Sequence, residues 1–283
     1  MTNCCASVCA RMVHSMGLPI GSRTSRGWMQ VFASLDRQYI RTSSIMALPF
    51  RSQSVMLMRS GAMALSLVAG LTVSSARADE PPAEDTRPLS PAQVLLFETQ
   101  HLQNVTRAGT LGYAYVRDGA AGFADTVAVQ IRQVNPDGSK NLAFDYLTGT
   151  HHVVFPELDH FRGNPLLMLT LERDVAEMKD QVGLSTSYFR NKLRQAFVDR
   201  ATVADGTFLL NGTAVPAKVV TVRPFTDDPR LERMSQLQAK AYTFVLSDQV
   251  PGTIAEIRID MPRDERMGAP AFEQRTTFQG VQP

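Results

Sequence analysis

Residues 127–146, VAVQIRQVNPDGSKNLAFDY, decide the fold class. Apolar and polar side chains alternate on both sides of the central NPDG, which is the pattern of two strands that each bury one face. Pro136 presets its own φ, and Gly138 accepts a positive φ at little cost, so the four central residues predict a tight turn. The stretch therefore predicts an antiparallel β-hairpin.

The same alternation recurs on both sides of this hairpin. The further strands that it predicts are 110–116, 151–155, 207–210, 215–222, 242–246, 257–259 and 272–278. Asn211-Gly212 lies between two of them and is the strongest hairpin signal in the chain. Because the strands do not alternate regularly with helices, we expect an α+β fold with an antiparallel, curved sheet of about eight or nine strands.

Two helices are predicted in the middle of the chain. Asn164-Pro165 is a cap followed by proline at the first helical position, Gly183 ends the first helix, and Ser185 can cap the second. Apolar side chains recur at helical spacing on both, namely Leu171, Val175 and Met178 on the first and Phe189, Leu193 and Phe197 on the second. We therefore expect a central pair of amphipathic helices whose apolar stripes turn inward.

The charged side chains of the helices allow more than one interpretation. On the first helix we expect the charges to face water, namely Glu172, Arg173, Glu177, Lys179 and Asp180. Asp174 and Glu177 could together hold a proton or a cation, although such spacing normally gives a solvated face. Arg190 and Arg194 on the second helix could bind an acidic partner or anionic headgroup, or one arginine could pair with an internal acid.

Residues 58–78 have the features of a signal peptide. A short basic start at Met58-Arg59 precedes an apolar stretch, 62–73, and the small-residue pattern Ala76-Arg77-Ala78 follows. The apolar stretch is too short to span a bilayer, and no cysteine lies at the cleavage point to carry a lipid. We expect cleavage after Ala78 and a periplasmic or secreted protein with no transmembrane segment in its mature part.

The rest of the chain divides around this signal. Residues 1–57 have no sustained apolar period and are interpreted as an extension that is disordered or arises from a misassigned start. Residues 79–90 are rich in proline and acids and form a flexible arm in this interpretation. The continuous pattern that follows predicts a single α+β domain over 91–283.

Charge and cysteine content exclude several classes of function. Eight of the 29 basic residues but only one of the 27 acidic residues precede residue 79. Residues 79–283 therefore carry a net charge near −5, which argues against nucleic acid as a partner. All three cysteines, Cys4, Cys5 and Cys9, also lie in that first part. Residues 79–283 contain no nucleophile elbow, zinc-protease, dinucleotide or P-loop motif. We therefore predict no cofactor and favour a protein without enzymatic activity.

The densest group of candidate metal ligands is His152, Glu157 and His160. Imidazole and carboxylate groups suit zinc or copper. However, neighbouring residues on a strand point to opposite faces, so His151 and His152 could not both ligate one ion. A metal-assisted enzyme remains the alternative to a binding protein.

Four short sequence segments resemble a family of exported proteobacterial proteins. They are RGNPLLM at 162–168, YFRN at 188–191, PFTDDP at 224–229 and VLSDQVPG at 245–252. This resemblance implies export and brings no activity, cofactor or catalytic residue. The order of elements is also similar to the curved half-barrel of periplasmic lipoprotein carriers, in which an antiparallel sheet wraps around helices.

These observations favour a protein that binds an apolar small molecule, such as a lipid, or an envelope partner protein between the sheet and the helices. The candidate residues are Leu171, Val175, Met178, Phe189, Leu193 and Phe197 in the apolar stripes, with Arg190 and Arg194 at the interface. A structural role in envelope assembly is a third possibility.

Overall fold

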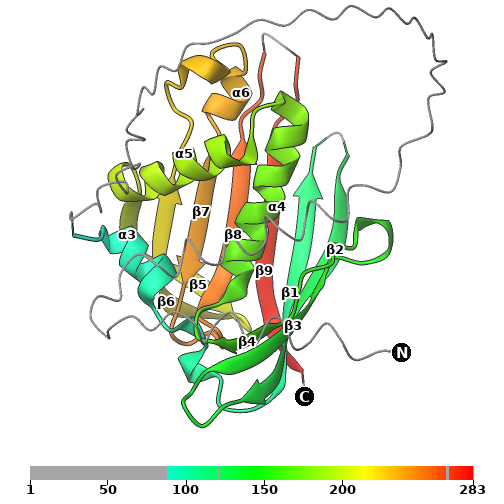
Figure 1. Cartoon of the computed structure of the whole chain (residues 1–283), viewed down its shortest axis with the longest axis vertical. Coiled ribbons are helices and arrows are strands. Elements are labelled where there is room, and N and C mark those ends of the chain that lie inside the picture. The colour runs from blue at the N-terminus through cyan, green and yellow to red at the C-terminus, as the bar shows by residue number, and fades with distance from the viewer. Residues whose placement is uncertain (1–87, 120, 266–267, 283) are drawn as a thin grey trace, which may run out of the picture. The chain divides into compact units, whose positions relative to one another are not determined.

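The computed structural model describes residues 88–119, 121–265 and 268–282 (Figure 1). The chain divides into two units, Met1–Ala78 and Asp79–Pro283, and every described residue belongs to the second. The expected extension, the signal peptide and most of the flexible arm lie outside the described residues.

Nine antiparallel strands form one open sheet within the described residues. They are β1 (Gly109–Asp118), β2 (Phe123–Val134), β3 (Lys140–Tyr146), β4 (Leu158–Phe161), β5 (Thr202–Leu210), β6 (Thr213–Val222), β7 (Ala241–Leu246), β8 (Ile254–Met261) and β9 (Phe272–Gln282). Their order is β4-β3-β2-β1-β9-β8-β7-β6-β5. The expected α+β class and antiparallel sheet are confirmed. The sheet consists of two meanders that join where β1 pairs with β9.

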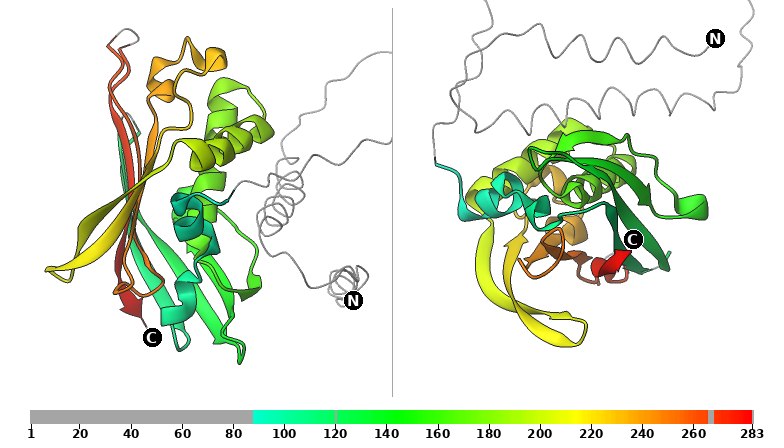
Figure 2. Two further views of the ribbon diagram at one scale, coloured as in Figure 1. Left: turned by 90° about the vertical axis from the view of Figure 1, so that its left-hand side faces the viewer. Right: turned by 90° about the horizontal axis from the view of Figure 1, so that it is seen from below.

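The helices lie on one face of this sheet (Figure 2). The two long ones are α4 (Pro165–Val182) and α5 (Thr186–Asp199), and the short ones are α3 (Pro91–Gln93), the π-helical η1 (Val94–Glu98), the 3-10 helices η2 (His101–Asn104), η3 (Gly149–His151) and η4 (Pro229–Leu231), and α6 (Ser235–Gln238). Side chains from α4, α5 and the sheet form one continuous apolar core. The core therefore fills the layer between the sheet and the helices.

Local signals located the turns and helix ends correctly. Gly138 has a φ of 81°, and Asn211 and Gly212 have φ values of 50° and 81°, as the two predicted hairpin turns require. The Asn164 side chain accepts a hydrogen bond from the backbone N–H of Leu166, and Gly183 ends α4 with a φ of 76°. These signals work because each depends on residues that are adjacent in the chain.

The strand expected over His151–Phe155 is wrong. The chain turns sharply after β3, where Leu147 and Gly149 have φ values of 63° and 52°, and it then forms η3. In this stretch Val153 makes only an isolated bridge to Tyr146. The strand itself, β4, follows Pro156, whose nitrogen cannot donate to a sheet.

The expectation that the charges of α4 face water is correct for Lys179 and Asp180, which are exposed, and wrong for the rest. Glu172 and Asp174 are buried, and Arg173 and Glu177 are half-buried. The physical reason is that other elements supply partners for these side chains: α5 supplies Arg190, β1 supplies Arg117, and the start of β7 supplies Lys240 and Tyr242.

Candidate functional site

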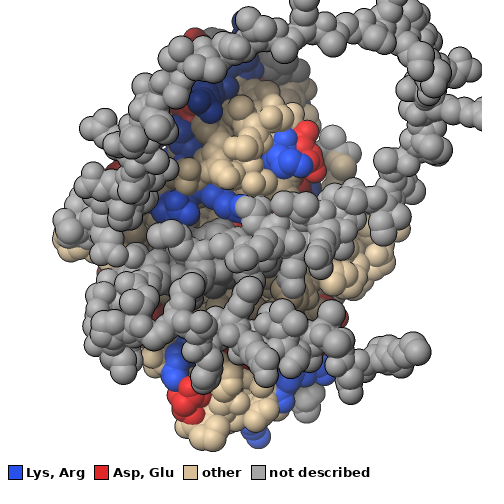
Figure 3. Space-filling view, viewed as in Figure 1, with Lys and Arg blue, Asp and Glu red and all other residues tan. Residues whose placement is uncertain are grey.

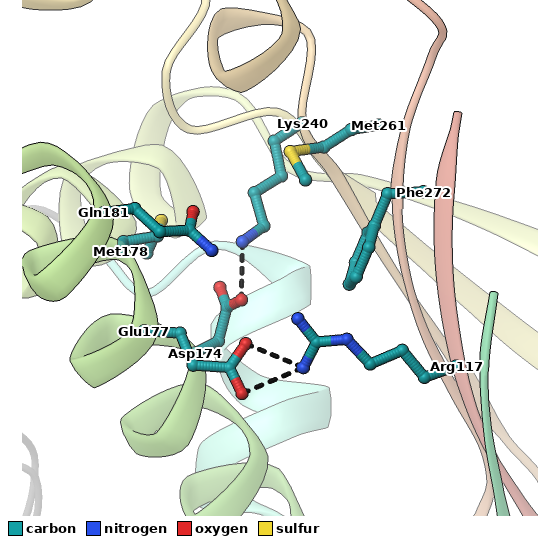
Figure 4. A pocket seen from close by; sticks show the side chains of 8 residues that line it. All are labelled: Arg117, Asp174, Glu177, Met178, Gln181, Lys240, Met261 and Phe272. Carbon is teal, nitrogen blue, oxygen red and sulfur yellow. Dashed lines mark hydrogen bonds and ion pairs between the residues drawn. The ribbon is translucent and has the colours of Figure 1, made fainter. Parts of the chain in front are cut away.

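A pocket of about 40 Å³ lies between the C-terminal half of α4 and the sheet (Figure 4). Its lining combines charged and apolar side chains. They are Arg117, Asp174, Glu177, Met178, Gln181, Lys240, Met261 and Phe272. Four come from α4, and the others come from the ends of β1, β8 and β9 and from the residue before β7.

One side of the pocket is a buried polar triad. The Lys240 ammonium lies 2.5 Å from Oδ1 of Asp174, and the Tyr242 hydroxyl donates to Oδ2 at 2.5 Å. The Lys240 and Asp174 side chains are only 3% and 5% exposed. Burial, followed by the nearby charge of Asp174, raises the pKa of Tyr242 well above its usual value. The triad thus ties the middle of α4 to the start of β7.

The other side of the pocket contains Glu177 between two arginines. Nη1 of Arg117 lies 3.0 Å from both carboxylate oxygens, and Nη2 of Arg173 lies 2.9 Å from Oε1. The Arg117 guanidinium also lies 4.9 Å from the centre of the Phe272 ring. A cation above an aromatic face is favourable, so Phe272 helps to fix Arg117 in the rim of the pocket.

Arg173 connects this side of the pocket to the interior of the sheet. Its Nη1 donates to the Tyr115 hydroxyl at 2.6 Å, and that hydroxyl donates to Oε1 of Gln274 at 2.8 Å. Burial is the largest cause that raises the pKa of Tyr115. The hydroxyl therefore remains a neutral donor while it accepts from the guanidinium.

The apolar wall of the pocket comes from Met178, Met261 and Phe272. Met261 and Phe272 pair across β8 and β9 and are half-buried. Met178 is buried and belongs to the main core. The pocket therefore has charged groups on two sides and an apolar wall, of which Met178 is the most deeply buried member.

The structure places all six predicted stripe residues in the core, each with 5% or less of its surface exposed. They are Leu171, Val175, Met178, Phe189, Leu193 and Phe197. The Phe197 ring contacts Phe244 of the sheet at a centroid distance of 5.9 Å. Met178 is the member of this set that also lines the pocket. The apolar stripes therefore supply packing, and one of them reaches the pocket.

The two predicted interface arginines lie in different surroundings. Arg190 binds Glu172 of α4 through Nε at 3.0 Å and Nη2 at 2.6 Å, which joins α5 to α4. Arg194 is exposed and donates to Asn191 within α5. In the view of Figure 1, the Lys and Arg side chains that can be seen form several separate groups on the surface (Figure 3). Arg190 thus follows the simpler interpretation, an arginine paired with an internal acid.

The predicted metal ligands do not come together. His152 and Glu157 are exposed, and His160 has a φ of 52° with its Nδ1 3.3 Å from the Ser139 hydroxyl. The neighbouring His151 ring stacks on Phe123 at 3.8 Å. Across the part of the chain that the structure describes, no three His, Cys, Asp or Glu side chains form a group that could hold a metal ion.

Two polar sites were not found from the sequence. One is the triad of Asp174, Lys240 and Tyr242, in which Asp174 is more than sixty residues from the other two and no local motif marks the group. The other is His101, whose buried ring lies between Leu95 and Asn164. Asp174 does follow Leu171 at helical spacing, which could have suggested that it faces inward.

No protein-family model matches the chain, and no curated protein matches it. Among solved structures, lipoprotein LppX of Mycobacterium tuberculosis is similar with a TM-score of 0.30 and 10% sequence identity, over 68% of this chain and 96% of that one. Among the described residues, no helix is both long and apolar enough to cross a membrane.

Proposed function

We propose that this protein is an exported, non-enzymatic binding protein that takes up a small molecule with an apolar part at the pocket between α4 and the sheet. The observation that carries the proposal is the composition of that pocket, where charged groups adjoin an apolar wall of Met178, Met261 and Phe272. Ligand sites typically combine apolar lining with a few placed polar groups. Export and the resemblance to exported proteobacterial proteins are parts of this proposal.

The pocket must widen to accept such a molecule, because its volume of about 40 Å³ is several-fold smaller than the roughly 300 to 1,000 Å³ of typical ligand pockets. Its two methionines should keep the free-energy cost of widening small, since their unbranched side chains change rotamer readily. In the proposed arrangement the sheet is curved, α4 and α5 form a central amphipathic pair, and α4 covers the bound molecule. The ligand's apolar part would follow Met178 towards the core.

The charged groups of the pocket support binding better than catalysis. Both carboxylates, Asp174 and Glu177, are already paired with cations at 3.0 Å or less. A general base needs a lone pair directed at its substrate. The pocket therefore has the polar groups to orient a ligand, and we assign it no reaction.

The test is saturable binding of the neutral apolar probe N-phenyl-1-naphthylamine to the folded, solvent-extracted protein. We expect fluorescence to increase with one binding site per chain and Met261→Trp to abolish the increase, because the larger ring fills the pocket. The matched control is Met234→Trp, since Met234 is 38% exposed and does not line the pocket. Absence of saturable binding, or equal binding by both variants, would contradict the proposal.

A further inference from the structure

The charges around the pocket do not balance. Three cations, Arg117, Arg173 and Lys240, are linked through direct ion pairs to two carboxylates, Asp174 and Glu177. Glu177 is shared by both arginines, whereas Asp174 pairs with Lys240. Among the described residues of this cluster, one positive charge is therefore left over.

This excess charge is poorly solvated. The cationic side chains are 18% (Arg117), 13% (Arg173) and 3% (Lys240) exposed. A charge that is partly removed from water is costly unless a counter-charge lies near it. Low-dielectric walls also strengthen the attraction between the cluster and an incoming anion.

The cationic groups are also directed at the pocket. The ammonium of Lys240 and the guanidinium of Arg117 point into the same space from different elements, and the side-chain amide of Gln181 lies beside them (Figure 4). Both carboxylate oxygens of Glu177 bind Nη1 of Arg117, and the other terminal nitrogen of the guanidinium is turned towards the pocket (Figure 4). An oxyanion between these groups could accept from both cations.

We propose that this pocket recognises an anionic headgroup, so that the ligand is an amphiphile with one apolar chain and a carboxylate or phosphate group. This inference rests on the proposed binding function and adds the sign of the ligand's charge. The headgroup occupies the space between Arg117 and Lys240, and the chain runs along the Met178, Met261 and Phe272 wall. A cationic headgroup in this place would add to the excess positive charge.

The experiment compares ligands that share one chain and differ in the headgroup. Dodecanoate, dodecyl phosphate, dodecanol and dodecyltrimethylammonium are each used to displace N-phenyl-1-naphthylamine below their critical micelle concentrations. We expect both anions to bind about tenfold or more tightly than dodecanol, and the cation to bind weakest. This series uses the unaltered protein, so its outcome does not depend on whether a variant folds.

Charge variants test whether the cluster causes the preference. Arg117→Gln should remove most of the advantage of dodecanoate over dodecanol, while Glu177→Gln should preserve or increase it, because that change raises the net positive charge. Lys218→Gln is the matched control, since Lys218 is an exposed cation paired with Asp205 on the β5–β6 hairpin. A merely structural role would make Arg117→Gln and Glu177→Gln weaken all ligands alike, and that result would overturn the inference.

The possible outcomes separate the two proposals. If none of the four ligands displaces the probe, the proposed binding function itself fails. If all four bind equally, the binding function stands and the anionic headgroup is wrong. Acetate and inorganic phosphate serve as chain-free anions, and displacement by either as effectively as by dodecanoate would show a site for small free anions instead of an amphiphile.

Discussion

The buried ring of His101 joins two segments that are far apart in the sequence. Its Nε2 donates to the carbonyl of Leu95 at 2.9 Å, and its Nδ1 accepts from the backbone N–H of Asn164 at 3.3 Å. Since a carbonyl can only accept and an amide N–H can only donate, the ring has to be neutral to make both bonds. Burial is the main cause that lowers the pKa of His101 below its usual value of 6.5.

Acidification should therefore destabilise the fold through His101. The unfolded chain takes up a proton near pH 6.5 while the folded ring resists it, so the contribution is intact above pH 6.5 and is lost as the pH falls below it. We expect the melting temperature to fall between pH 7.5 and pH 5.5, and His101→Gln to flatten this dependence. The control is His152→Gln at an exposed position. An equal pH slope in all three proteins would contradict this role for the ring.

Two glycines with the same backbone conformation allow a second test at this scale. Gly212 and Gly252 have φ values of 81° and 79°, but an added Cβ would meet nothing at Gly212 and would lie 2.7 Å from Cδ1 of Leu111 at Gly252. We expect Gly212→Ala to cost about 1 kcal/mol from backbone strain alone. Gly252→Ala should cost about 1 to 3 kcal/mol more, because Leu111 is fully buried and cannot move away freely. Denaturant unfolding measures both, and equal costs would show that Leu111 adapts.

Residues such as these mark the limit of what the sequence predicts. The turns at Gly138 and Gly212 and the Asn164 cap were predictable, because their chemistry is local. The environments of His101 and Gly252 were not, because each depends on partners brought together by the sheet.

Helix α4 also has features that the local sequence predicts and features that depend on other elements. Its bounds and its inward-facing Leu171, Val175 and Met178 follow from spacing and capping. Spacing alone could not show that Glu172 and Asp174 are also buried, because the partners that permit this belong to α5 and β7. Charge on a helix predicts exposure only when no other element supplies a counter-charge.

The Asp174–Lys240 pair should behave as a unit that holds α4 against the sheet. Removing either partner leaves a buried charge unpaired, so Asp174→Asn and Lys240→Met should each cost about 3 to 5 kcal/mol. The double variant should cost clearly less than the sum, because it removes the unpaired charge as well as the attraction. A double-variant cycle in denaturant measures this coupling. Additive costs would mean that the two side chains are independently solvated.

For the sheet as a whole, the sequence predicts the fold class and the direction of the strands, but not the order in which the strands lie side by side. Alternation and turns predict about eight or nine strands, their antiparallel sense and the α+β class, although the strand expected at 151–155 lies instead at Leu158–Phe161. They do not show which strand lies beside β1 on the side away from β2, since that neighbour is the last strand of the chain. Pairing over such a distance leaves no pattern within a short window.

Export stays a prediction that concerns the whole molecule. We expect the mature protein to begin at Asp79, and replacement of Ala76 and Ala78 by bulky charged residues to leave an uncleaved precursor, because signal peptidase accepts only small side chains there. N-terminal sequencing of the envelope fraction measures this. Translation from Met58 should also be sufficient, and loss of export without residues 1–57 would show that the upstream segment is needed.

The pairing of β1 with β9 gives the molecule a late folding step. Tyr113 pairs with Phe278, which follows it by 165 positions, and the two meanders share no other strand pairing. Contacts between distant parts of a chain form slowly, because a long loop must close first. A chain that ends before Phe272 should therefore lack cooperative unfolding and be sensitive to protease, and a compact truncated protein would contradict this. Until strand β9 has been made, the polypeptide cannot complete its sheet, and this would suit the proposed export, because a translocation channel accepts a chain that has not yet folded.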